Sequence, residues 1–445
     1  MISSDLALTY PRASVLQAQN GMQQLVLAHQ SELAADNQIP CFFWGRLTDP
    51  FLSAKCLLTL SKVVRTSFCP IPPVFRDPIV SAGSDQIRFE GFSSCNGVYA
   101  RLDVLEDAID GEFIASGTTN VDFNEPMLHA LNAVKKGEEL IFGVGSKELS
   151  IQTSNHKVVE KKVSLPARWI KGLSSVQLFM ADMEPRFTLN KMEVISLFQG
   201  LPKGASKGSF YLSKRGKRYM WSPLPGKDGV HFGGIARLRL LEGLIMYCDR
   251  LQVYQSREGT AVAVLADFGH MRFTLALSPD NYRGFSGEGN VLEHMVQEVP
   301  TEWIHGMHAL LNSNEQFNPT LLSIEHDVPF QTMDTLTASL ASIGLLGYDL
   351  QQGKHYYRRL PFKMERILSL NPRLKHARQL LDRQGVQFIK RAADQVEARV
   401  EGSGVQHTVL IREGKAQCTC NWFTKHADKR GLCKHILAVK MQLEV

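Results

Sequence analysis

The sequence predicts a multidomain α+β protein that ends in a small domain organised by cysteine and histidine. At 445 residues the chain is too long for a single core of ordinary size. Between residues 95 and 320, segments with the two-residue period of strands alternate with helical segments, separated by Gly and Asn. Three of the eight cysteines lie between residues 418 and 433. These observations favour packed α+β modules followed by one compact cysteine-containing unit.

Five regions are expected along the chain. They are an N-terminal mixed region (1–90), an α+β module (91–173), a second α+β module (174–320), a winged-helix-like helical region (321–389) and a small domain of short β-sheet plus helix (390–445).

The N-terminal region combines helical periodicity over residues 14–35 with a proline-rich connection at 69–78, where proline stops both helices and central strands. The first α+β module follows as a strand at 98–105, a helix at 125–137 and strands from 138 to 154.

The second module repeats this plan of strand, helix and glycine from residue 187, and continues into strands up to residue 277. The pattern indicates duplicated α+β units, as in sliding-clamp-like folds. Within it, "SKRGKRY" (213–219) places four basic residues on an expected hairpin. They could form an anion-binding patch, or only a basic turn.

Apolar residues at Leu336, Leu340, Ile343 and Leu346 predict a helix that ends at the glycines of 344–347. Alternation over 348–360 then predicts a short hairpin, and helix plus hairpin is typical of a winged-helix-like unit. A helix at 371–384 precedes three short strands within 397–420, and a last helix covers 433–444.

Charge is distributed unevenly along the chain. Residues 352–445 hold 19 Lys and Arg against 8 Asp and Glu, a net charge of +11, whereas residues 1–351 carry −5. A basic C-terminal end attracts a polyanion such as nucleic acid, or an acidic protein surface. The alternative is that these side chains only solubilise exposed faces.

The chain begins with no basic, apolar leader, and no later segment is apolar for the length of a bilayer. The five cysteines outside the C-terminal cluster are scattered singly, which is not a disulfide framework. We therefore expect a soluble, cytoplasmic protein without membrane contact.

The C-terminal motif consists of two close pairs of ligands. Cys418 and Cys420 lie at a strand end, and Cys433 and His435 lie twelve residues further on at a helix start. Thiolate and imidazole in this number suit tetrahedral Zn²⁺. A redox pair would usually be Cys-x-x-Cys, a catalytic Cys/His dyad would leave the first pair unused, and chance clustering is improbable. Because protein ligands fill all four positions, the expected role of the metal is structural.

This motif, Cys-x-Cys-x₁₂-Cys-x-His between a short sheet and a helix, resembles the SWIM zinc finger. The stretches "IGLLGYDLQQGKHYYRRLPF", "NPRLKHARQLL" and "CTCNWFTKHADKRGLCKHILA" extend the resemblance to bacterial SWIM-type zinc-finger proteins. Members of that family are often found with a MoxR-type AAA+ ATPase and a von Willebrand factor A protein. The resemblance implies a zinc-dependent module for binding nucleic acid or protein, and it implies no reaction.

Aromatic and basic side chains around the motif are candidates for the partner surface, since rings stack on bases and cations pair with phosphates. These candidates are Trp422, Lys425, Lys429, Arg430 and Lys434. For Trp422, a place in the small core of the finger is an equal alternative.

The leading interpretation is a non-enzymatic zinc protein that binds nucleic acid, with DNA favoured over RNA, or an acidic protein surface. The second is a docking adaptor for a complex of a MoxR-type ATPase and a von Willebrand factor A protein, without nucleic-acid contact. An enzyme with its site in residues 95–300 is the third class, but no catalytic residues can be singled out there.

Overall fold

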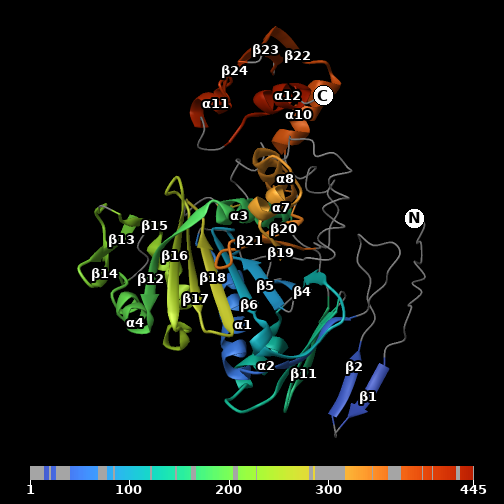
Figure 1. Ribbon diagram of the computed structural model, residues 1–445, viewed down its shortest axis with the longest axis vertical. Helices are drawn as coiled ribbons and strands as arrows, with labels where there is room; N and C mark the ends of the chain where they lie inside the picture. Colours follow the sequence, from blue (N-terminus) through green and yellow to red (C-terminus); the bar gives the residue numbers. More distant parts are fainter. Residues whose placement is uncertain are drawn as a thin grey trace. The chain divides into compact units, whose positions relative to one another are not determined.

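The chain folds into two compact units, seen in the computed structural model of Figure 1. The described residues are 15–19, 22–26, 41–68, 78–83, 86–120, 123–145, 148–161, 167–203, 209–226, 228–279, 284–285, 316–342, 344–358, 372–392, 394–402, 404–426 and 431–443. Unit 1 comprises residues 1–165, 183–282 and 358–362, and unit 2 comprises 166–182, 283–357 and 363–445. The mixed α and β, multidomain character expected from the sequence is confirmed.

The N-terminal region differs from the helix expected over residues 14–35. Strands β1 (Val15–Gln19) and β2 (Met22–Val26) pair in an antiparallel hairpin, with Gln19 opposite Met22. Asn-Gly, the sequence between them, is the strongest short signal for a two-residue hairpin turn. It therefore outweighs the apolar spacing that resembled a helix.

Unit 1 is built from three copies of one plan, a strand and a helix followed by three strands. The first copy is β3 (Cys41–Leu47), α1 (Pro50–Arg65), β4 (Ile79–Gly83), β5 (Gln86–Phe92) and β6 (Val98–Val104). The second is β8 (Gly117–Asn120), α2 (Glu125–Ala133), β9 (Leu140–Gly145), β10 (Glu148–Thr153) and β11 (Lys157–Lys161). The third is β12 (Met183–Asn190), α4 (Lys191–Gln199), β16 (Arg250–Ser256), β17 (Val262–Asp267) and β18 (Met271–Leu277).

The first two copies exchange their leading strands. β3 pairs with β9, and β8 pairs with β4, so neither copy closes its sheet alone. With β7 (Ile109–Phe113), the result is a five-stranded sheet of order β11-β10-β9-β3-β7 and an eight-stranded sheet of order β12-β16-β17-β18-β6-β5-β4-β8. Apolar residues of both sheets, α1 and α2 form one continuous core. This mutual completion explains why the first two copies fold as one body.

Helix starts in unit 1 follow their local sequence. The Asp49 side chain accepts a 3.0 Å hydrogen bond from the Leu52 amide at the start of α1, where Pro50 occupies the first turn. At α4, Asn190 and Glu193 form a capping box, each side chain accepting from a backbone amide of the other residue. The strand-to-helix step at residue 190 is thus encoded locally.

Buried charges lie on the face of the eight-stranded sheet opposite α1. Arg358 donates to both carboxylate oxygens of Glu90, at 2.9 and 3.0 Å, and the Tyr99 hydroxyl donates to the same carboxylate at 2.5 Å. Burial alone would raise the pKa of Glu90, but Arg358 and Tyr99 together hold it below its usual value. Arg358 is therefore held in unit 1 by a fully buried ion pair.

A small third sheet completes unit 1. Its strands are β13 (Ser209–Arg215), β14 (Arg218–Ser222) and β15 (Val230–Gly233), in the order β14-β13-β15. Figure 1 shows it in green beside β12 and α4. The hairpin expected around "SKRGKRY" is β13–β14 and is confirmed.

The first part of unit 2 gathers a helix from a distant stretch of sequence. Its elements are α3 (Ala167–Ala181), β19 (Gln316–Phe317), α7 (Pro319–Glu325), α8 (Phe330–Ser342), β20 (Leu346–Asp349) and β21 (Lys354–Tyr357). The strands form a sheet of order β19-β21-β20, and Leu178 of α3 packs against the core of α8. Gln177 also accepts a 2.8 Å hydrogen bond from the Tyr348 amide. α3 thus joins β20 and α8, although the whole third copy of unit 1 separates it from them in the chain.

His355 should make this part sensitive to acid. The side chain is 5 % exposed beside Phe317 and Tyr348, and burial lowers its pKa to about 4. The unfolded chain takes up the proton near pH 6.5 but the folded chain only near pH 4, so stability falls as pH falls through this window, by up to about 3 kcal/mol. We expect the urea concentration at which β20 and β21 lose half of their protection from hydrogen exchange to be lower at pH 4 than at pH 7. In His355→Gln the drop should shrink, and an equal drop in both proteins would contradict the assignment.

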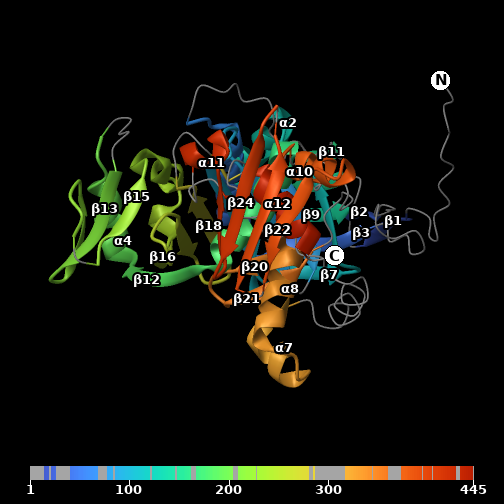
Figure 2. The same cartoon turned by 90° about the horizontal axis from the view of Figure 1, so that it is seen from above.

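The C-terminal part of unit 2, called the finger here, is a four-stranded meander with helices packed on it (Figure 2). Its elements are α10 (Pro372–Asp382), β22 (Val386–Arg391), β23 (Gln395–Glu401), β24 (Gln406–Arg412), β25 (Lys415–Cys418), α11 (Asn421–His426) and α12 (Lys434–Leu443). Apolar residues of α10, α12 and the strands share one core, which also includes the three cysteines. The sequence predicted α10, α12 and three of the strands, but not β22. No helix within the described parts of the chain is long and apolar enough to span a bilayer.

Candidate metal centre

The structure brings all four predicted ligands together. Cys418 ends β25, Cys420 precedes α11, and Cys433 and His435 lie at the start of α12. Their ligand atoms all lie within 4.8 Å of one another, and all four residues are buried.

The distances fit a tetrahedral zinc ion. The Nδ1 atom of His435 lies 3.7 Å from the Cys418 sulfur and 4.0 Å from the Cys433 sulfur. Zinc–sulfur and zinc–nitrogen bonds of about 2.3 and 2.0 Å, at tetrahedral angles, place the sulfur and nitrogen atoms about 3.5 Å apart. The chemistry and spacing of this donor set therefore fit Zn²⁺. Four protein ligands complete the coordination, which is the arrangement of structural zinc sites.

Local hydrogen bonds fix the first ligand pair. The Thr419 amide donates to the Thr408 carbonyl at 3.1 Å, and the Thr408 amide donates to the Thr419 hydroxyl at 3.0 Å. These bonds extend the β24–β25 pairing past Cys418. The Phe423 amide then donates to the Cys420 sulfur at 3.4 Å, which favours its thiolate form.

The second pair is positioned by a helix start. The Leu437 amide donates to the Cys433 carbonyl at 3.0 Å, so Cys433, directly before the first residue of α12, accepts the first hydrogen bond of this helix. His435 lies in the first turn, and its ring centroid is 4.6 Å from that of His407 on β24. The positive end of the α12 dipole favours a negative charge on the Cys433 sulfur.

The cysteines differ in acidity. Hydrogen bonding from Cys418 lowers the pKa of Cys433 to about 4, and the same bond raises the pKa of Cys418. Burial raises the pKa of Cys420. Since thiolate is the metal-binding form, a bound dication displaces the protons of the thiols that it coordinates.

Arg373 of α10 joins the two ligand-bearing segments, and the sequence reasoning missed this role. Its Nη1 donates to the Leu432 carbonyl at 2.9 Å, one residue before Cys433. Its guanidinium also lies 4.7 Å from the ring centroid of Trp422, two residues after Cys420. The only available signal was its place in "NPRLKHARQLL", a helix with no visible link to the motif.

The predicted partner residues are distributed as follows. Trp422 is half-buried and packs against the finger core, Lys425 is exposed near the end of α11, and Lys434 is half-buried at the start of α12. Lys429 and Arg430 lie outside the described residues. The role of all five as partner contacts stays a prediction.

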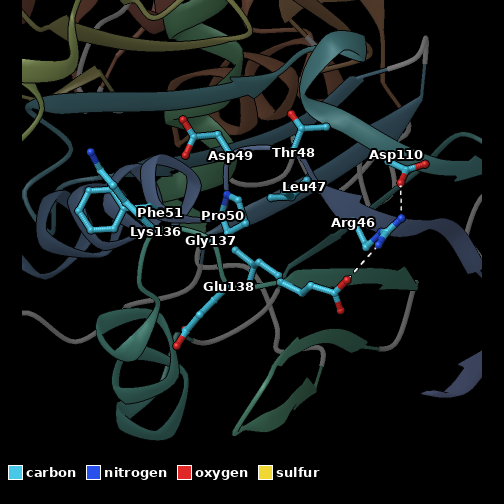
Figure 3. Close-up of a pocket in the computed structure, with 12 residues that line it drawn as sticks. Arg46, Leu47, Thr48, Asp49, Pro50, Phe51, Asp110, Lys136, Gly137 and Glu138 are labelled. Carbon is cyan, nitrogen blue, oxygen red and sulfur yellow. Dashed lines mark hydrogen bonds and ion pairs between the residues drawn. The ribbon is translucent and has the colours of Figure 1, made fainter. Parts of the chain in front are cut away.

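A separate cavity of about 480 Å³ lies in unit 1, at the start of α1 (Figure 3). Several of its charged side chains form ion pairs with one another: Arg46 donates to Asp110 at 2.7 Å and to Glu139 at 2.9 Å. Lys136 lies over the Phe51 ring, 5.8 Å from its centroid. Among the described residues that line it there is no cysteine or histidine.

Part of the chain is similar to several solved structures. The proliferating cell nuclear antigen of Entamoeba histolytica is 13% identical, with a TM-score of 0.35, over 54% of this chain and 98% of that one. The β sliding clamp of C. crescentus is 13% identical, with a TM-score of 0.37, over 53% and 65%. A PCNA complex from Sulfolobus tokodaii gives 7% identity and a TM-score of 0.38, over 53% and 98%. All three TM-scores lie below 0.5.

No curated protein matches the chain. One family model does, and it covers the metal centre. Together with the four clustered ligands, it confirms the zinc-finger prediction for this end of the chain: residues 407–444 match the SWIM zinc finger.

Proposed function

We propose that the chain is a zinc-dependent, non-enzymatic nucleic-acid-binding protein that uses the surface of its finger. One observation carries this proposal. Nine Lys and Arg side chains of the finger are exposed, and none of them forms an ion pair with a carboxylate among the described residues. The nine are Lys375, Arg378, Arg383, Lys390, Arg391, Arg399, Arg412, Lys415 and Lys425.

Exposed Lys and Arg side chains that form no ion pair with a carboxylate can bind phosphate groups, and the metal centre would hold the domain that carries them in shape. Among the described residues from 372 to 443 there are 12 Lys and Arg but only 5 Asp and Glu, so this small domain is strongly positive. A phosphate backbone releases counterions when such side chains neutralise it, and this release supplies most of the affinity for nucleic acid. Zinc has a structural part in this proposal: it joins β25 to α12 and so holds the basic surface in shape.

Salt dependence tests the proposal. We expect the full chain to bind a labelled DNA duplex with an affinity that falls steeply with salt, and DNA to be bound at least as tightly as RNA. Lys425→Gln and Lys415→Gln should each flatten the plot of log affinity against log salt by about 0.9, because each removes about one phosphate contact. Zinc content should stay unchanged. Tight binding with no salt slope, or no binding of any nucleic acid, would contradict the proposal.

The second candidate is a protein-docking adaptor, such as the resemblance to proteins found with MoxR-type ATPases and von Willebrand factor A proteins implies. A different surface favours it. Leu321, Ile324 and Phe330 of α7 and α8 are 56 %, 72 % and 56 % exposed, although they are large and apolar. Exposed Glu325 and Asp327 lie between them. Exposed apolar groups of this kind mark protein contacts.

The order of elements in this region supports a winged-helix-like unit within the second candidate. β19, α7, α8 and the β20–β21 hairpin follow one another in the chain, and α3, from an earlier stretch of sequence, adds a third helix to this three-stranded sheet. However, neither α7 nor α8 contains a single Lys or Arg. A helix that reads DNA needs cations against phosphates, so this unit suits a protein partner better than nucleic acid.

A further inference from the structure

The β13–β14 hairpin of unit 1 ends in four basic residues. Arg215 and Arg218 are directly opposite each other, so the loop between them has only two residues, Gly216 and Lys217. Gly216 has a φ of +60°, the left-handed conformation that such a tight loop requires. Lys214 completes the set, and all four basic side chains are exposed.

This arrangement costs stability and brings no local gain in charge pairing. Like charges directly opposite on paired strands repel each other, as Arg215 and Arg218 do here. None of the four basic side chains pairs with a carboxylate in the described parts of the chain. Lys214 does lie over the Tyr219 ring, 5.1 Å from its centroid. The positive charge at the tip therefore remains available to a partner.

The base of the hairpin is held firmly. The Trp221 indole donates to the Leu197 carbonyl of α4 at 3.1 Å, and the Tyr219 hydroxyl donates to the Thr188 carbonyl of β12 at 3.4 Å. The Tyr219 ring also packs edge-on against Phe187. Because the base is fixed on two elements of unit 1, the tip presents its charges with little further ordering cost on binding.

We propose that this hairpin is a second nucleic-acid contact, in which Arg215, Lys217 and Arg218 bind backbone phosphates. Cβ atoms of residues directly opposite on paired strands lie about 5 Å apart, so the two guanidinium groups can reach neighbouring phosphates. A two-stranded ribbon is also narrow enough for the major groove of B-DNA. The site shares only its class of ligand with the finger, and its binding does not require the finger to bind.

The test uses the full chain and a labelled DNA duplex of about 20 base pairs, about two helical turns. The labelled strand on its own, as single-stranded DNA, is the second probe. We expect Arg215→Gln/Arg218→Gln to reduce the slope of log affinity against log salt by about 1.8. For each arginine this corresponds to an about eightfold loss of affinity at 0.1 M salt, relative to the affinity at 1 M salt. If the variant weakens binding of the duplex alone, the hairpin binds in the groove. If it weakens binding of both the duplex and the single strand, the hairpin binds the phosphate backbone of both.

Lys135→Gln/Lys157→Gln is the matched control, since it removes two exposed positive charges from other positions of unit 1. It should leave the slope unchanged. An equal loss in this control would reduce the effect to net charge and overturn the proposal. The finger variant Lys415→Gln/Lys425→Gln separates the two sites. If it lowers the slope while the hairpin variant does not, the hairpin proposal fails and the finger proposal stands. The reverse result would leave the hairpin alone as the site.

Discussion

Replacing Cys433 with serine is expected to release zinc and to unfold the finger while unit 1 stays folded. The three cysteines belong to the finger core, and the metal joins β25 and α11 to α12. Structural zinc contributes on the order of 10 kcal/mol to small domains at neutral pH, more than the whole stability of many of them. The damage should be confined to the finger, from α10 to α12, because these elements share one core and unit 1 has its own continuous core.

Elemental analysis and hydrogen exchange measure this effect. Wild-type protein should contain one zinc per chain, and the variant should lose both the metal and exchange protection in β23, β24 and α12. Cys248→Ser is the matched control. Cys248 is also buried, but it lies in unit 1 and donates to the Arg250 carbonyl at 2.9 Å, a bond that serine can replace. Full zinc occupancy in a Cys418→Ser/Cys433→Ser protein would refute the ligand assignment.

The metal centre could be read from sequence because its information is local. The four ligands lie within eighteen residues, and the strand end and helix start that carry them have clear patterns of their own. Hairpins such as β13–β14 and the capped step from β12 to α4 were predictable for the same reason. In each case the residues that determine the structure are close together in the sequence.

The features that could not be predicted depend on contacts between residues that are far apart in the sequence. The exchange of β3 and β8 between two copies of one plan is decided by pairing across about 100 residues for β3–β9 and about 40 residues for β8–β4, which no local periodicity encodes. α3 joins unit 2 through Gln177 and Leu178, whose partners lie about 140 to 170 residues away. The buried Glu90–Arg358 pair joins residues 268 positions apart. The charges of both residues are visible in the sequence, but their burial is not.

Arg373 shows the same limit inside the candidate site. The sequence predicted only that it lies in a helix, and gave this residue no role in the site. In the structure it reaches the carbonyl before Cys433 and the ring after Cys420 at once, because α10 packs beside α12 in the finger core. This contact also bears on whether Trp422 is part of the framework or a partner surface.

Trp422→Ala is expected to destabilise the finger by about 3 kcal/mol and to weaken zinc retention. The ring packs against the finger core and carries the Arg373 guanidinium on its face. Removal of a large aromatic side chain from a core costs about 3–5 kcal/mol, and the half-buried state of this ring favours the lower end. Urea unfolding followed by zinc release to a chelator would measure both effects. Lys425→Ala, three residues along the same short helix, is the exposed control and should leave stability and zinc unchanged.

The opposite result has an equally definite meaning. If Trp422→Ala leaves folding and zinc intact but weakens nucleic-acid binding by roughly 1–3 kcal/mol, the ring stacks on a base and belongs to the partner surface. A double-mutant cycle with Arg373→Ala decides between the two roles, because only a framework ring is coupled to Arg373 in the stability of the free protein. The expected coupling is about 0.5–1 kcal/mol, the usual strength of a cation over an aromatic face near the surface. Coupling near zero would show that the Arg373–Trp422 contact contributes nothing to the finger, and the ring would then be free to serve a partner.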